Sequence, residues 1–356
     1  MTTTQDSRGK RWIAPLAMLI AAGLLPIVLT SGFQLRLASI VCVFAILCTG
    51  FNLLYGFAGQ ISMGQQGFFA LGAYAFALLQ SKAGWSFAFA FPASLAICAV
   101  AALIVGLPLL RLRTHYLAMA TLCFGLVFAG VASRWIEFTG GTSGMQIPAM
   151  TFGDHIVSRT ELYYVLLGVT ALVLALQNFI IGSHLGRALS AMKGDETAAA
   201  SLGVNVTAYK LRVFVLAAMI AGLAGIGFAL LSRQVNPSFG EFPILVTMLT
   251  IVVVGGLGTR YGPLLGAIVV TLAPQGLASF GDFETLIYGA CLLLFLMFIP
   301  HGLAGALQAL GQQLRRRLWP APPPVAEPVD ANAPAGTAPT ASTISSTIAR
   351  TWHASL

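Results

Sequence analysis

Residues 36–66 read RLASIVCVFAILCTGFNLLYGFAGQISMGQQ, and this stretch decides the fold. After Arg36 the first part is a continuous apolar run to about residue 55, and a helix needs about 20 such residues to cross a bilayer. The next apolar run, from Gly67 to Gln80, is too short to cross alone at about 1.5 Å per residue. We therefore expect the second helix to begin near Ile61, which would carry polar amide groups into the membrane.

The rest of the chain repeats this pattern. Of its 356 residues, 57% are hydrophobic and 8% are charged, and the mean hydropathy is +0.86, whereas soluble domains carry about 25% charged residues. We expect an all-α polytopic membrane protein with about ten transmembrane helices. The predicted spans are 13–30, 36–55, 61–80, 87–110, 115–133, 161–181, 210–232, 243–258, 262–280 and 283–300.

The positive charges predict the orientation of these spans. The net charge of +8 does not indicate nucleic acid, because the charges stand at span ends and form no single stripe. With both termini in the cytoplasm, most Lys and Arg residues lie inside, as the positive-inside rule requires. Of the 19 Lys and Arg residues, those left outside are Arg36, Lys82, Arg134, Arg159 and Arg233.

The ends of the chain differ from its centre. We expect residues 1–12 to be a cytoplasmic segment before a retained first helix, because another span follows at once and no cleavage site is evident. Residues 13–310 form the predicted transmembrane domain. Residues 311–356 begin with basic residues suited to lipid headgroups and continue as a Pro-, Ala- and Thr-rich tail, which predicts disorder. The five cysteines lie in apolar runs without metal-type spacing, so we expect no metal, disulfide or cofactor.

The cytoplasmic loop 182–209 is predicted to carry two short helices. One spans about Gly186 to Met192. The other begins with Asp195 and Glu196, where carboxylates favour a helix start, and ends at Gly203. Such a hairpin would suit docking into a groove on a soluble partner.

The order E-x-A-A-x-x-x-G in this loop resembles the Glu-Ala-Ala loop of bacterial ABC importer permeases. In that family the loop contacts the ATPase subunit and passes its movement to the membrane helices. The resemblance implies a coupling role for Gly186, Arg187, Glu196, Ala198, Ala199 and Gly203.

Further motifs resemble the branched-chain amino acid permeases specifically, over residues 36–306, and the longer of the two sibling permeases in that family. Gln66 stands where the family usually has a small residue, and the tail from residue 320 is unlike the family. The matching motifs are Asn52–Gln65, Thr114–Gly125, Thr139–Gly144, Gly255–Pro263 and Pro300–Gly305.

The resemblance implies a transport subunit of the bacterial inner membrane and no enzyme activity of its own. The implied partners are membrane lipid, a sibling permease in a heterodimer, two cytoplasmic ABC ATPases and a periplasmic solute-binding protein. The chain has no G-x-x-x-x-G-K-[ST] loop, so ATP would be bound by a partner. The implied solutes are branched-chain or related small amino acids.

Two groups of residues are candidates for the solute route. Polar side chains within the bilayer face protein or water, because facing lipid is costly. They either line a path or hold helices together, and the sequence favours neither. The path candidates are Asn52, Gln60, Ser62, Gln65, Gln66 and Thr121, and the candidates for an outer-mouth loop are Thr139, Gly140, Gly141 and Thr142.

Two alternatives belong to other classes. A secondary transporter or channel for urea, an amide or an aromatic acid is the main one, although no charged residue lies in the middle of a span, where ion coupling usually needs one. A G-x-S-G around Ser143 resembles rhomboid intramembrane proteases. Such a serine needs a nearby base, and by the predicted topology only His155 shares its side of the membrane.

Overall fold

The computed structural model describes residues 32–112, 114–148, 151–152, 155–277, 283–298 and 302–306. The predicted segments 1–12 and 13–30 and the tail 311–356 lie outside these residues. The described chain is almost entirely helical, and its four strands contain two residues each, so the predicted all-α class is confirmed.

The long helices follow the predicted spans closely. Five are long and apolar enough to cross a membrane: α2 with the π-helical turn η1, α4, α5, α7 and α10. Their bounds, with those of α3, α11, α12 and α13, are α2 (Gly32–Asn52), η1 (Leu53–Phe57), α3 (Gln65–Ser81), α4 (Phe87–Leu109), α5 (Thr114–Arg134), α7 (Arg159–Gly182), α10 (Val206–Ser232), α11 (Phe242–Gly255), α12 (Gly262–Leu277) and α13 (Glu284–Phe298).

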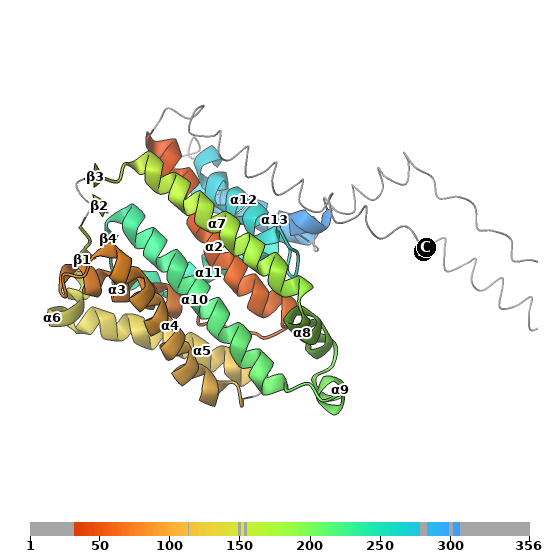
Figure 1. Ribbon diagram of the computed structural model, residues 1–356. Coiled ribbons are helices and arrows are strands. Elements are labelled where there is room, and N and C mark those ends of the chain that lie inside the picture. The colour runs from red at the N-terminus through yellow and green to blue at the C-terminus, as the bar shows by residue number, and fades with distance from the viewer. Residues whose placement is uncertain are drawn as a thin grey trace, which may run out of the picture. The chain divides into compact units, whose positions relative to one another are not determined.

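Short elements lie at the two ends of this bundle. Helices α8 and α9 lie at one end and the strands at the other (Figure 1). Strand β1 pairs antiparallel with β4, and β2 pairs with β3. The bounds of the short elements are α6 (Ile136–Thr139), η2 (Gly141–Ser143), β1 (Met145–Gln146), β2 (Thr151–Phe152), β3 (His155–Ile156), α8 (His184–Gly194), α9 (Glu196–Ser201), β4 (Gln234–Val235) and η3 (Pro237–Gly240).

One predicted boundary is wrong. Helix α3 begins at Gln65 and not near Ile61, and residues 59–64 are not helical. With 17 residues, α3 is shorter than the hydrocarbon core of a bilayer is thick. The structure resolves the mismatch by making residues 58–64 a connection that follows α2, in which Gly59 is exposed and the other residues are buried or half-buried. Protein contacts can hold non-helical backbone at that depth.

Burial separates central helices from peripheral ones. Within its most apolar window, α2 is 78% buried and α10 is 67% buried, whereas α4 is only 22% buried and α7 is 33% buried. Large apolar side chains on α4 and α7 are exposed, including Phe89, Ile104 and Phe179. Helices α2 and α10 therefore form the core with the buried α3, and parts of α4 and α7 face outward, where lipid can solvate them.

Glycines allow α3 and α10 to pack backbone to backbone. A side chain at Gly72 would overlap the backbone of Gly222, and one at Gly225 would overlap the carbonyl of Phe69. Close approach of this kind is typical of small residues at helix contacts in membranes.

This contact predicts the cost of adding a single methyl group. Gly225→Ala should destabilise the protein by about 1–3 kcal/mol, because the new Cβ forces the helices apart. Gly168→Ala on α7 is the matched control, since nothing lies within 4 Å of its added Cβ. Thermal unfolding of both variants in detergent checks this, and equal transition temperatures would contradict the crossing described here.

Candidate functional site

The connection between α2 and α3 and the first turn of α3 carry four polar side chains in the protein interior. Gln60, Ser62, Gln65 and Gln66 are each at most 2% exposed. Their side-chain oxygen and nitrogen atoms have no hydrogen-bond partner among the described residues. A buried amide without a partner costs about 1–3 kcal/mol. Four such side chains in one segment are therefore costly, as is typical of groups kept for a ligand.

The backbone around these side chains is tied down more firmly. In η1 the chain forms a wide turn. The backbone amide of Gln60 then donates to the backbone carbonyl of Leu54 at 3.1 Å. The amide of Met63 donates to Thr121 Oγ1 of α5 at 3.0 Å. The Thr121 hydroxyl in turn donates to the Leu117 carbonyl at 2.8 Å. The segment is thus held by its main chain while its side chains keep unused hydrogen-bonding capacity.

Helix α5 forms one wall of the segment. The side chain of Gln66 lies against Gly125, where an added Cβ would be 2.6 Å from Gln66 Nε2. If Gln65 and Gln66 served only to hold helices together, their side-chain amides would be hydrogen-bonded to neighbouring helices. No such bonds are found among the described residues. The structure therefore brings together Gln60, Ser62, Gln65, Gln66 and Thr121, as a polar segment lined by α5.

Asn52 belongs to a different arrangement. Its Nδ2 donates to the Thr259 carbonyl at 2.9 Å, and its Oδ1 accepts from the Gly258 amide at 2.9 Å. On α7, Gln177 Nε2 donates to the Arg260 carbonyl at 3.3 Å. Both side chains hold the turn between α11 and α12. Asn52 therefore has its partners already, unlike the four unpartnered side chains.

The loop 182–209 contains the two short helices that its sequence predicts. Ser183 caps α8 by accepting from the Leu185 amide. Asp195 caps α9 by accepting from the amides of Thr197 and Ala198. Gly203 follows with φ +85°, in the left-handed region that favours glycine. We call residues 184–203, which contain α8 and α9, the hairpin.

One contact joins the hairpin to the polar segment. Lys193, in the last turn of α8, donates from Nζ to the Gly56 carbonyl in η1 at 2.6 Å. The stem of Lys193 also packs near Gly59, where an added Cβ would be 3.2 Å from Lys193 Cγ. The hairpin thus contacts the chain just before Gln60. The sequence did not single out Lys193, because its partner is 137 positions away.

Glu196 forms a pair within the chain, because its Oε1 lies 2.6 Å from Lys210 Nζ. Helix α9 turns back so that its first residue meets Lys210 near the start of α10. The Glu196 side chain is still 52% exposed, so this is a surface pair.

The hairpin has a buried side and an exposed side. Gly186 and Ala199 are buried, whereas Arg187, Ala198 and Gly203 are exposed. Leu202 is 83% exposed and was missed from the sequence, although an apolar residue just before a helix-ending glycine in a polar loop is a usable signal. Leu202 thus presents one apolar side chain among the exposed residues of the loop.

At the other end of the bundle, the predicted outer-mouth residues form a compact turn. The Thr139 hydroxyl donates to the Ala132 carbonyl at 2.6 Å and accepts from the Gly141 amide at 3.3 Å. Gly140 and Gly141 have positive φ, and Thr142 is exposed. The turn is tied to the α10–α11 connection by β1–β4 pairing.

Ser143 lies in this same turn, and its carbonyl accepts from Gln234 Nε2 at 3.0 Å. Among the residues that the structure describes, no three His, Cys, Asp or Glu side chains are grouped as metal ligands. The polar segment and the hairpin are therefore the features from which a function can be argued.

Comparison with known proteins identifies the family. Residues 33–299 match the family model described as branched-chain amino acid transport system, permease component. The chain is 32% identical over 313 residues to the high-affinity branched-chain amino acid transport system permease proteins LivM of Salmonella typhimurium and of Escherichia coli, covering 81% of this chain and 73% of each relative.

A second group of relatives is more distant. The chain is 24% identical over 281 residues to the permease protein LivH of Escherichia coli, covering 74% of this chain and 91% of that protein. No solved structure matches the chain. The chain is a multi-pass membrane protein that belongs to the branched-chain amino acid transport permease family.

Proposed function

We propose that this chain is a permease subunit of an ABC importer that forms, with a sibling permease, the path for branched-chain or related small amino acids. The observation that carries the proposal is the contact between Lys193 and Gly56. It joins a surface-exposed hairpin to a buried segment with unused hydrogen-bonding groups. A permease driven by a separate ATPase needs such a link between docking surface and path.

The partners follow from the two ends of the bundle. The hairpin, with Arg187, Ala198 and Leu202 exposed, would contact the cytoplasmic ATPase subunits. The turn around Thr139 and Thr142 would face a periplasmic solute-binding protein. Support for a sibling permease comes from the relatives, since both LivM and LivH are named as permeases of one kind of transport system. An ATPase in the cytoplasm and a binding protein in the periplasm would place the chain in the bacterial inner membrane.

The path would run along the polar segment. The amide groups of Gln60, Gln65 and Gln66 can both donate and accept hydrogen bonds. They could therefore exchange contacts with the ammonium and the carboxylate of an amino acid without holding it as a fixed charge would. Thr121 would act by holding the segment against α5, and Asn52 by holding the α11–α12 turn beside η1.

The alternative is a channel or secondary transporter for a small polar solute. Unpartnered glutamines would serve urea or an amide equally well. No Asp, Glu, Lys or Arg lies between Arg36 and Lys82, so this stretch supplies no acidic or basic side chain for ion coupling. Dependence of uptake on the ATPase separates the two, because a channel would carry its solute without it.

The orientation is tested by two exposed threonines. In a background whose native cysteines are replaced by alanine, Thr142→Cys should react with an impermeant thiol reagent added to intact cells. Thr197→Cys should react only after the cells are opened. Both residues are exposed, so accessibility depends on the side of the membrane. Labelling of Thr197→Cys from outside would overturn the orientation.

The path is tested at Gln65 and Gln66. Changing either to Leu should reduce uptake at least about tenfold if the amide contributes one hydrogen bond of about 1.4 kcal/mol to the moving solute. Stability should not fall, because the amide groups have no protein partner to lose. Uptake and membrane abundance are measured together, and a parallel loss of both would favour a packing role.

The link is tested at Lys193. Lys193→Met keeps the apolar stem and removes the charged donor, a bond of about 1.5–3 kcal/mol. Uptake should fall about tenfold or more while the ATPase is still captured in pull-down assays.

Lys210→Met is the matched control for this experiment. It removes only the surface pair with Glu196, which should be worth about 0–1 kcal/mol, and should leave uptake within about twofold of the parent. Equal effects of the two lysine variants would remove the special role of the Gly56 contact.

A further inference from the structure

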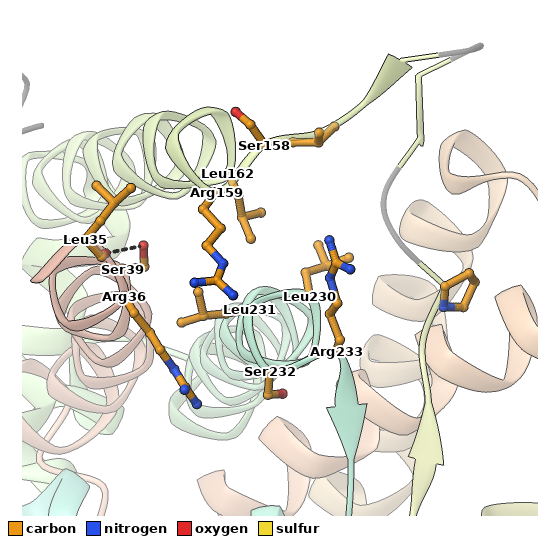
Figure 2. A pocket seen from close by; sticks show the side chains of 12 residues that line it. Leu35, Arg36, Ser39, Ser158, Arg159, Leu162, Leu230, Leu231, Ser232 and Arg233 are labelled. Atoms are coloured by element: carbon orange, nitrogen blue, oxygen red, sulfur yellow. Dashed lines mark hydrogen bonds between the residues drawn. The ribbon is translucent and has the colours of Figure 1, made fainter. Parts of the chain in front are cut away.

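A pocket of about 270 Å³ lies at the end of the bundle away from the hairpin. It is formed where α2 and α7 begin and α10 ends. Three arginines line it, namely Arg36 of α2, Arg159 of α7 and Arg233, which follows α10 (Figure 2). These are three of the five cations that the charge pattern leaves on the outer side.

None of the three guanidinium groups has a hydrogen bond or ion pair with another described residue. Glu161, in the first turn of α7, already accepts from the Ser158 amide through Oε2 at 2.7 Å. All three arginines are exposed, and like charges that line one pocket repel one another. An anion in the pocket would reduce this repulsion.

Of the three serines that line the pocket, two donate to backbone carbonyls, and the third, Ser158, accepts from the Glu161 amide at 3.2 Å. Ser39 donates to the Leu35 carbonyl at 2.9 Å (Figure 2), and Ser232 donates to the Phe228 carbonyl at 2.8 Å. An anion would therefore be bound through the arginines. Guanidinium groups bind phosphate and carboxylate oxygens in pairs, which gives strong and oriented contacts.

Arg233 adds a backbone argument. It has φ +54°, and it is the sole non-glycine residue with positive φ among the residues described. This conformation costs a side chain about 1 kcal/mol and favours Gly or Asn. An arginine at this position indicates that its side chain is needed at the pocket.

The remaining walls are apolar and identify the kind of anion. Leu35, Leu162, Leu230 and Leu231 line the pocket. Helix α7, which contributes Arg159 and Leu162 to the pocket, also exposes apolar side chains further along, and Leu172 is 67% exposed. A soluble anion has no use for apolar walls, whereas a phospholipid places a phosphate and the start of its acyl chains at this depth.

We propose that this pocket binds an anionic phospholipid, with its phosphate on Arg36, Arg159 and Arg233 and its acyl region along α7. The proposal does not depend on the transported solute or on ATPase docking. The three arginines form one site, and we expect each of them to contribute to its affinity for the lipid.

The experiment uses the full-length chain in vesicles of phosphatidylcholine and phosphatidylglycerol, with spin-labelled phosphatidylglycerol as the probe. Arg159→Gln should lower the preference for phosphatidylglycerol over phosphatidylcholine about fivefold, as expected for one basic residue near a lipid headgroup. The triple change of Arg36, Arg159 and Arg233 to Gln should abolish it.

Arg134→Gln is the matched control, because Arg134 is an exposed arginine at the same end of the bundle. It should leave the preference unchanged. An unchanged preference in the triple variant would overturn the proposal, and so would displacement of the lipid by inorganic phosphate. A triple variant that keeps the lipid but no longer captures a protein from the periplasm would also overturn it, because the arginines would then bind protein.

Discussion

The structure depends on one requirement: a backbone that leaves the helical path inside a membrane must find its hydrogen bonds within the protein. The connection from Ala58 to Gly64 meets this requirement through η1 and through Thr121. Because the connection uses residues that would otherwise extend α3, that helix is short and must be enclosed. The enclosing helices α5 and α10 then approach so closely that glycines are needed where α10 crosses α3.

The same requirement explains what could be predicted from the sequence. The spans from residue 36 onward follow from local hydropathy, which is why α2, α4, α5, α7 and α10 lie where they were expected. The start of α3 could not be predicted, because it is set by Thr121 on another helix. The pairing of Glu196 with Lys210 and the bonds of Asn52 to the α11–α12 turn also escaped prediction. Motif resemblance located the hairpin and the polar segment, but not the lysine that joins them.

The positive charges of this chain differ in whether its own residues bind them. At the hairpin end, Lys193 and Lys210 are each bound to a group of the same chain, so charge serves internal order. At the opposite end, Arg36, Arg159 and Arg233 have no such partner among the described residues. In the positive-inside rule, all of these residues serve only as markers of orientation. Their contacts in the structure show which charges stabilise the fold and which are available to a ligand.

The π-helical turn η1 has a consequence for how the length of this chain can vary. A π turn holds one more residue than an α-helical turn, so deleting one residue between Leu53 and Phe57 would restore a regular helix. The residues after the deletion would rotate by about 100° relative to α2. Gln60 would then face a different wall, and the main-chain bond to Thr121 would be lost. Among natural relatives, gaps should therefore collect in exposed turns such as the one after Gly203, while the spacing from Asn52 to Gln65 stays constant.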